Sequence, residues 1–220
     1  MIITFGTQKG GAGKTTLAIA FANYLAINTE RKLQVYDFDY QKSFYNKWIE
    51  DGEINQKSKL YEVSVIDEEK DKDNYLFKDL DSILEMKHSP EIHLFDLAGT
   101  LDQKYSDLLV YSDYIIIPFE YSDISVKSTL VFKNLLGLLE SEAERIFIRS
   151  RYDKSYSYKN QPEMDIELSK YGTLLDEPVL KRNSLQKINT RQLTFDQKKA
   201  VKQPFNQILE IIEQQFPTHP

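Results

Sequence analysis

The chain has 220 residues, of which 41% are hydrophobic and 28% charged, and a net charge of −6, which favours one large globular domain over a disordered chain. Cysteine is absent, so disulfides, thiolate metal sites and iron–sulfur clusters are excluded. No apolar run reaches the ~18–20 residues that a membrane-spanning helix needs, and no basic segment precedes the short apolar N-terminus, so we expect a cytoplasmic protein.

Short apolar runs alternate with amphipathic segments along the chain, a pattern typical of strand–helix units around a mostly parallel sheet. We expect strands at Ile2–Phe5, Leu33–Tyr36, Leu60–Ile66, Ile92–Phe95, Tyr114–Pro118 and Ile146–Ile148. We expect helices at Thr15–Ile27, Tyr75–Met86, Val126–Leu139 and Pro204–Phe216. No linker interrupts this alternation, so residues 1–220 are predicted to form one α/β domain, a twisted sheet flanked by helices.

Three of the predicted strands lead directly into residues that can bind or react. Gly6 follows the first strand, Asp37 the second, and Asp96 the strand at Ile92–Phe95. Ligands of open α/β sheets lie at the carboxyl ends of the strands. These three positions are therefore expected to meet at one site.

The segment from Gly6 to Thr16 matches the phosphate-binding pattern G-x-x-x-x-G-K-[ST], and it lies between a predicted strand and a predicted helix. Its glycines allow the backbone to curl so that N–H groups face phosphate oxygens, and the helix adds the positive end of its dipole. Lys14 is expected to bind the β- and γ-phosphates, Thr15 to ligate Mg²⁺ and Thr16 to bind the α-phosphate. The predicted nucleotide-binding residues of the loop are Lys9, Gly10, Gly11, Ala12, Gly13, Lys14, Thr15 and Thr16.

The run from Lys9 to Thr16, KGGAGKTT, resembles the deviant Walker A box of the ParA/MinD family of P-loop ATPases. That resemblance implies that Lys9 is a signature lysine that reaches the ATP of a partner subunit, so that ATP binding makes a homodimer with two nucleotides between the subunits. A cation supplied in this way stabilises charge during phosphoryl transfer, as an arginine finger does. The alternative is that Lys9 is a solvated loop lysine.

The segment VYDFDYQKS, which contains Asp37 and Asp39, resembles the D-x-D-P-Q switch of the same family, with Tyr40 in place of the proline. The resemblance implies that Asp39 positions the attacking water, and Lys9, Lys14 and Asp39 are the predicted catalytic residues. Asp37 is expected to support the Mg²⁺ shell. An Asp at the end of a strand is also a common helix cap, and this alternative stays open for Asp37.

The segment IHLFDLAGT resembles a Walker B strand, which implies that Asp96 faces Mg²⁺ alongside Thr15 and Asp37. Further along the chain, Arg149 stands where relatives carry an adenine-contacting Asn. Pro178 begins a segment that resembles one packing on the base, and both residues are predicted to bind the nucleotide. No guanine-binding N-K-x-D box is present, so the expected cofactors are ATP and Mg²⁺.

Charge is unevenly distributed along the chain. Residues 145–202 hold 13 Lys/Arg against 7 Asp/Glu, whereas residues 1–144 hold 15 against 25. A ParA-like protein is expected to bind DNA non-specifically through such a basic region, although a solvated surface is the alternative. The predicted C-terminal helix has no Lys or Arg after residue 202, so we expect its apolar side to pack on the domain and not on a membrane.

Taken together, the motifs predict a short ParA-like ATPase that dimerises on ATP, hydrolyses it slowly and positions DNA, with a ParB-like or other protein as activator. Three segments, at residues 38–45, 96–100 and 118–123, also resemble the TraA-like group of conjugative elements. Two other functions remain open: an ATP-dependent kinase or ligase for a small molecule, and an ATP-binding regulatory module of a conjugation system.

Overall fold

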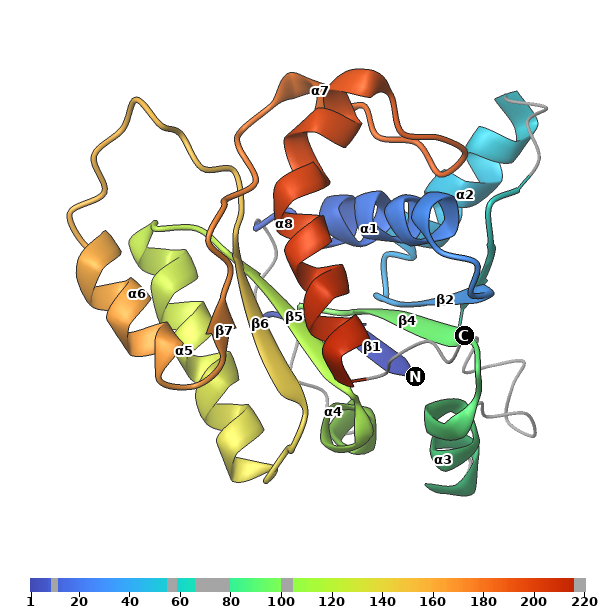
Figure 1. Cartoon of the computed structure of the whole chain (residues 1–220), viewed down its shortest axis with the longest axis horizontal. Coiled ribbons are helices and arrows are strands. Elements are labelled where there is room, and N and C mark those ends of the chain that lie inside the picture. Colours follow the sequence, from blue (N-terminus) through green and yellow to red (C-terminus); the bar gives the residue numbers. More distant parts are fainter. Residues whose placement is uncertain (9–11, 55–58, 66–79, 100–104, 216–220) are drawn as a thin grey trace.

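The computed structural model describes residues 1–8, 12–54, 59–65, 80–99 and 105–215. Its centre is a parallel sheet in the order β3-β2-β4-β1-β5-β6-β7 (Figure 1). The strands are β1 (Ile2–Phe5), β2 (Leu33–Phe38), β3 (Glu62–Val65), β4 (Ile92–Leu97), β5 (Tyr114–Phe119), β6 (Glu144–Arg149) and β7 (Thr173–Leu174). The predicted α/β class is confirmed, and β1 with its loop lies at the middle of the sheet.

Helices cover both faces of the sheet, which explains why the central strands are continuous apolar runs. One face is covered by α1 (Lys14–Asn28), α2 (Ser43–Ile54), α7 (Asn183–Gln186) and α8 (Phe195–Gln215) (Figure 1). The other face is covered by α3 (Leu80–His88), α4 (Ser106–Tyr111), α5 (Asp123–Leu138) and α6 (Gln161–Ser169). Two separate apolar cores result, one on each side of the sheet.

The C-terminal helix differs from its prediction. It begins at Phe195, and Pro204, the expected first residue, lies inside it. A capping box sets this start: the Thr194 hydroxyl accepts a hydrogen bond from the Gln197 N–H, and the Gln197 side chain accepts one from the Thr194 N–H. The first turns are polar and so lacked the apolar period on which the prediction relied.

The apolar side of α8 packs on the domain, as expected. Phe205 is fully buried and meets Phe21 edge-on at a centroid distance of 5.0 Å, and it contacts Tyr24 at 5.5 Å. Phe216, which was expected to extend this face, lies outside the described residues. Across the parts of the chain that the structure describes, no helix has both the length and the apolar character to cross a bilayer.

Several other helices and strands begin or end a few residues away from the positions predicted from the sequence. Strands β2 and β4 each continue past the predicted end, so Asp37 and Asp96 lie within the strands, one residue before their last residue. The predicted helix at Tyr75–Met86 appears as α3 from Leu80, and residues 75–79 are outside the described part. Four short or largely polar helices (α2, α4, α6 and α7) and the two-residue strand β7 were not predicted, because each offers too few apolar positions to give a period.

Gly6 directly follows β1 and lies against Phe132 of the helix α5. A Cβ at Gly6 would lie 2.5 Å from Cζ of Phe132, a buried ring. We expect Gly6→Ala to lower the free energy of unfolding by about 1–3 kcal/mol, as overpacking does. Urea unfolding measures this, and Gly137→Ala is the matched control. Apart from its chain neighbours and the backbone of its own helix, no described residue would have a heavy atom within 4 Å of a Cβ at Gly137 in α5, so that change should stabilise slightly. An equal effect of both changes would contradict the packing argument.

Candidate functional site

The phosphate loop joins β1 at the centre of the sheet to α1. Gly13 has φ 71, a left-handed backbone that favours glycine, and its carbonyl accepts the helix hydrogen bond from the Leu17 N–H at 2.9 Å. The N–H groups of the first turn of a helix have no intrahelical acceptor, so α1 presents donors to an anion here. Thr15 and Thr16 are half-buried in this turn. The predicted contacts Lys9, Gly10 and Gly11 lie outside the described residues.

Lys14 and Asp96 form a buried ion pair beneath the loop. The Lys14 ammonium donates to Oδ1 of Asp96, and the side chains are 6% and 0% exposed. The second carboxylate oxygen of Asp96, Oδ2, is buried, and none of the described residues forms a hydrogen bond with it. A buried carboxylate oxygen of this kind is costly unless a cation or water satisfies it.

The residues fit a Mg²⁺ ion bound together with phosphate. Asp96 offers its unpartnered oxygen, and the Thr15 hydroxyl is a second oxygen donor of the type that Mg²⁺ prefers. Among the described residues, no group of three or more His, Cys, Asp or Glu side chains forms a complete metal cage. Mg²⁺ in phosphoryl-transfer sites commonly takes one or two protein ligands and completes its shell with phosphate and water.

Asp37 lies beside Asp96, since the two residues are register partners on β2 and β4. Its carboxylate is 2% exposed and accepts hydrogen bonds from the N–H groups of Asp39 and Tyr45, both at 3.0 Å. These bonds fasten the first turn of α2 to the sheet, although Asp37 lies within β2 and is not the N-cap residue of that helix. Support of the Mg²⁺ shell by Asp37 stays a prediction.

Burial raises the pKa of Asp37 from 3.8 to about 6; the neighbouring Asp96 raises it too, while the backbone hydrogen bonds lower it. Because the folded-state pKa lies above the unfolded value, protonation favours the fold. This stabilisation is complete below about pH 4 and is lost as the pH rises through about 6.

Asp37→Asn removes this titration, so wild type should lose stability relative to the variant between pH 4 and pH 7, by up to about 3 kcal/mol. Denaturant unfolding of both proteins across this range measures the difference. A difference that is independent of pH would contradict the assigned burial of the charge.

Asp39 follows β2 and is half-buried. Its Oδ1 accepts a hydrogen bond from the Gln41 N–H at 3.0 Å, which shapes the turn before α2. The structure therefore brings Asp39 to the same edge of the sheet as Asp37, Asp96 and Lys14. Its role toward water stays a prediction.

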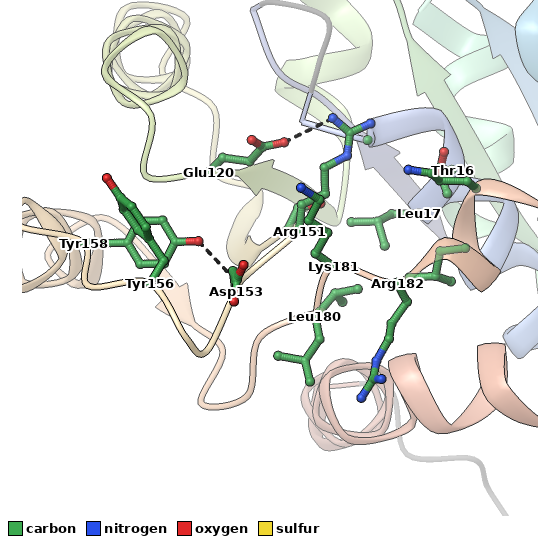
Figure 2. Close-up of a pocket in the computed structure, with 15 residues that line it drawn as sticks. Thr16, Leu17, Glu120, Arg151, Asp153, Tyr156, Tyr158, Leu180, Lys181 and Arg182 are labelled. Carbon is green, nitrogen blue, oxygen red and sulfur yellow. Dashed lines mark hydrogen bonds and ion pairs between the residues drawn. The ribbon is translucent and has the colours of Figure 1, made fainter.

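A cavity of about 430 Å³ opens next to the phosphate loop (Figure 2). Its size is within the range of small-ligand sites. One side is formed by the start of α1, and the opposite sides by the segments that follow β5, β6 and β7. The lining residues are Gly13, Thr16, Leu17, Glu120, Ser150, Arg151, Asp153, Tyr156, Tyr158, Val179, Leu180, Lys181, Arg182, Leu185 and Gln186.

Neither of the two predicted base-contacting residues lines this cavity. The Arg149 guanidinium donates to the Tyr121 hydroxyl at 2.6 Å, to the Leu175 carbonyl at 2.6 Å and to Asp165 at 2.8 Å, which ties β6 to α6. Pro178 lines a second cavity instead. The structure brings Arg151 and the tyrosines at 156 and 158 to the first cavity; the Tyr-rich sequence SRYDKSYSYK was the available signal.

Comparison with protein families matched residues 3–195 to the model described as the CobQ/CobB/MinD/ParA nucleotide binding domain. Comparison with curated proteins found no match. Among solved structures, a protein of Borrelia burgdorferi B31 bound to AMPPNP has 23% identity and a TM-score of 0.71, covering 97% of this chain and 98% of its own.

Two further solved structures have the same fold. A plasmid partition protein from Borrelia burgdorferi has 21% identity and a TM-score of 0.67, covering 95% of this chain and 97% of its own. The ParA of pNOB8, bound to nonspecific DNA, has 16% identity and a TM-score of 0.64, covering 97% and 98%.

Proposed function

This chain belongs to the CobQ/CobB/MinD/ParA nucleotide-binding domain family, and from that premise we propose that it is a ParA-like ATPase. In this proposal it binds Mg-ATP at the phosphate loop, forms a homodimer around the nucleotide and hydrolyses ATP slowly. This cycle of ATP binding and hydrolysis drives the partitioning or positioning of DNA, or the maintenance of a conjugative element. A ParB-like or other protein activator accelerates hydrolysis.

The observation that carries the proposal is the buried Lys14–Asp96 pair directly beneath the phosphate loop. A Gly-rich turn that served only to connect a strand to a helix would have no need of a buried charge pair, because desolvating two charges costs several kcal/mol per ion. The cost is explained if Lys14 binds phosphate and Asp96 binds a cation when the nucleotide is present.

In the proposed reaction, Lys14 and the N–H groups at the start of α1 bind the phosphates and stabilise the charge that develops on them. Thr15 and Asp96 hold Mg²⁺, which neutralises phosphate charge when it is bound. Asp39 accepts a hydrogen bond from the attacking water and aligns it with the γ-phosphate. Lys9 of the second subunit completes the charge stabilisation.

Two exposed apolar side chains support dimerisation through this edge of the sheet. Tyr40, which follows β2, is 59% exposed, and Ile124, in the first turn of α5 after β5, is 69% exposed. Both lie at the carboxyl ends of their strands, on the side that carries the phosphate loop. A second copy that covers this edge would bury them together with the nucleotide.

The basic residues of the C-terminal third support DNA binding. A second cavity, of about 650 Å³, lies between α8 and the segment after β7, and its lining includes Lys154, Lys181, Arg182 and Lys199 with two acidic residues, Glu177 and Asp196. The other proposed DNA contacts from this region are Lys159, Lys187, Arg191, Lys198 and Lys202, although Arg191 is buried against Trp48 and is the least suited.

DNA binding should depend steeply on salt, because each neutralised phosphate releases counterions. We expect Lys199→Ala to weaken binding to any duplex sequence and to reduce the slope of log K against log salt by about 1. Lys170→Ala is the control and should leave the slope unchanged. Lys170 is an exposed lysine that directly follows α6 and pairs with Glu167. Fluorescence anisotropy at several salt concentrations measures the slope for both variants. Equal slopes for wild type and Lys199→Ala would contradict the assignment of Lys199 to the DNA-binding surface.

Light scattering with ADP, ATP and duplex DNA tests the whole proposal. We expect a monomer with ADP, a dimer with ATP and a DNA complex that forms with ATP. A monomer under all three conditions, with ATP consumed when a small-molecule acceptor is supplied, would replace this proposal with a kinase or ligase.

A further inference from the structure

Arg151 follows β6 with a left-handed backbone, at φ 51. This conformation costs a residue with a side chain roughly 1–2 kcal/mol, so the surroundings must impose it. Hydrogen bonds on both neighbours do so: the Ser150 N–H donates to the Phe119 carbonyl at 2.8 Å, and the Tyr152 N–H donates to the Val179 carbonyl at 3.0 Å. Strained residues held in this way are concentrated at functional sites.

The Arg151 side chain extends from this turn to the phosphate loop. A Cβ at Gly13 would lie 3.5 Å from Nε and 3.9 Å from Cζ of Arg151. Gly13 and Thr16 line the same cavity as Arg151, and Figure 2 shows the arginine between the loop and Glu120. The guanidinium therefore lies where a phosphate bound near the start of α1 would meet it.

Glu120 forms an ion pair with Arg151 in the structure. Nη1 of Arg151 lies 3.4 Å from Oε1 of Glu120, and the side chains are 52% and 28% exposed. An ion pair this long and this accessible contributes about 0–1 kcal/mol. A phosphate accepts two parallel hydrogen bonds from a guanidinium and binds it more strongly, so Arg151 can exchange the carboxylate for a phosphate at little cost.

We propose that Arg151 is a nucleotide-binding residue whose guanidinium binds the α-phosphate from its own subunit, and that Glu120 is the counter-ion that this phosphate displaces. The inference rests on the proposed nucleotide site. Arg151 is a third cation, distinct from the two that the sequence predicted. Lys14 is buried in its ion pair with Asp96, and Lys9 is predicted to reach the nucleotide of the partner subunit.

The α-phosphate is common to ADP and ATP, and this sets the expected pattern. Loss of the guanidinium should lower the affinity for ADP and for ATP by the same factor, about 10–100-fold for a lost pair of charge-assisted hydrogen bonds. A residue that senses the γ-phosphate would instead weaken ATP alone.

The test is calorimetric titration of Mg-ADP and Mg-ATP into Arg151→Asn. Asparagine tolerates the left-handed backbone, so the change removes the cation without new strain. Arg151→Gly, which takes that backbone freely, is the second variant, and thermal unfolding checks that both remain folded. Lys170→Asn is the control, because it removes one positive charge at an exposed position that does not line this cavity.

We expect the binding of ADP and of ATP to be weakened equally in both Arg151 variants, and wild-type affinity in Lys170→Asn. Glu120→Gln should tighten both nucleotides several-fold, and this gain should shrink when Arg151 is also Asn. If Arg151→Asn binds ADP with the affinity of Lys170→Asn, this inference is overturned while the proposed function stands. If wild type binds neither nucleotide, the proposed function falls, and the inference falls with it.

Discussion

Lys14→Ala should abolish ATP binding and also destabilise the fold. The substitution removes the cation that is proposed to bind the β- and γ-phosphates, and it leaves Asp96 as a buried charge without its Lys14 partner. Breaking a buried pair from one side costs about 3–5 kcal/mol. We therefore expect a large drop in the free energy of unfolding together with the loss of nucleotide binding, measured by urea unfolding and calorimetric titration.

A double substitution separates the two effects. Lys14→Met with Asp96→Leu replaces the pair by apolar side chains of similar length, which for buried pairs is often neutral or stabilising. We expect it to restore most of the stability while ATP binding stays lost. ATP binding at wild-type affinity by either variant would contradict the assignment of the phosphate loop.

Asp39→Ala should trap the ATP-bound dimer. Loss of the group that is proposed to align the attacking water is expected to slow hydrolysis by about 10²–10⁴-fold, as for other positioned bases, while the phosphate contacts persist. Phosphate release under single-turnover conditions measures the rate, and light scattering measures how long the dimer lasts.

Asp39→Asn is the informative companion to this substitution. It keeps an oxygen to accept the Gln41 N–H, so the turn before α2 should be preserved, but it is a poorer acceptor for water. We expect its hydrolysis to be slow as well, which would separate the chemistry from the shape of the turn. Hydrolysis at the wild-type rate in Asp39→Ala would show that another residue positions the water.

The sequence predicted the centre of the molecule well, because the signals there are local. The apolar run of β1, the glycines after it and the start of α1 are contiguous in the chain, and the sheet rule brings Asp37 and Asp96 to the same edge. In the structure these residues lie on β2 and β4 in register. Helix α8 could have been placed better, since its capping residues Thr194 and Gln197 are visible in the sequence.

The cavity beside the phosphate loop, where the base is proposed to bind, could not be predicted in the same way, because it depends on contacts between distant segments. Arg149 was expected at the nucleotide, but Asp165 of α6 and Tyr121 after β5 hold its guanidinium. Arg151, two residues later, lies at the phosphate loop because its backbone turns left-handed between β5 and the segment after β7. The Tyr-rich segment that follows Arg151 is the local difference between the two arginines, and it does not predict which of them meets the phosphate loop.

A crystal structure with a non-hydrolysable ATP analogue and Mg²⁺ tests the central claim most directly. The account predicts that the triphosphate lies in the loop from Lys9 to Thr16, that Lys14 has moved from Asp96 to the phosphates, and that Lys9 faces the nucleotide of a second subunit. A nucleotide bound elsewhere, with Lys14 still paired to Asp96 in a monomer, would contradict it.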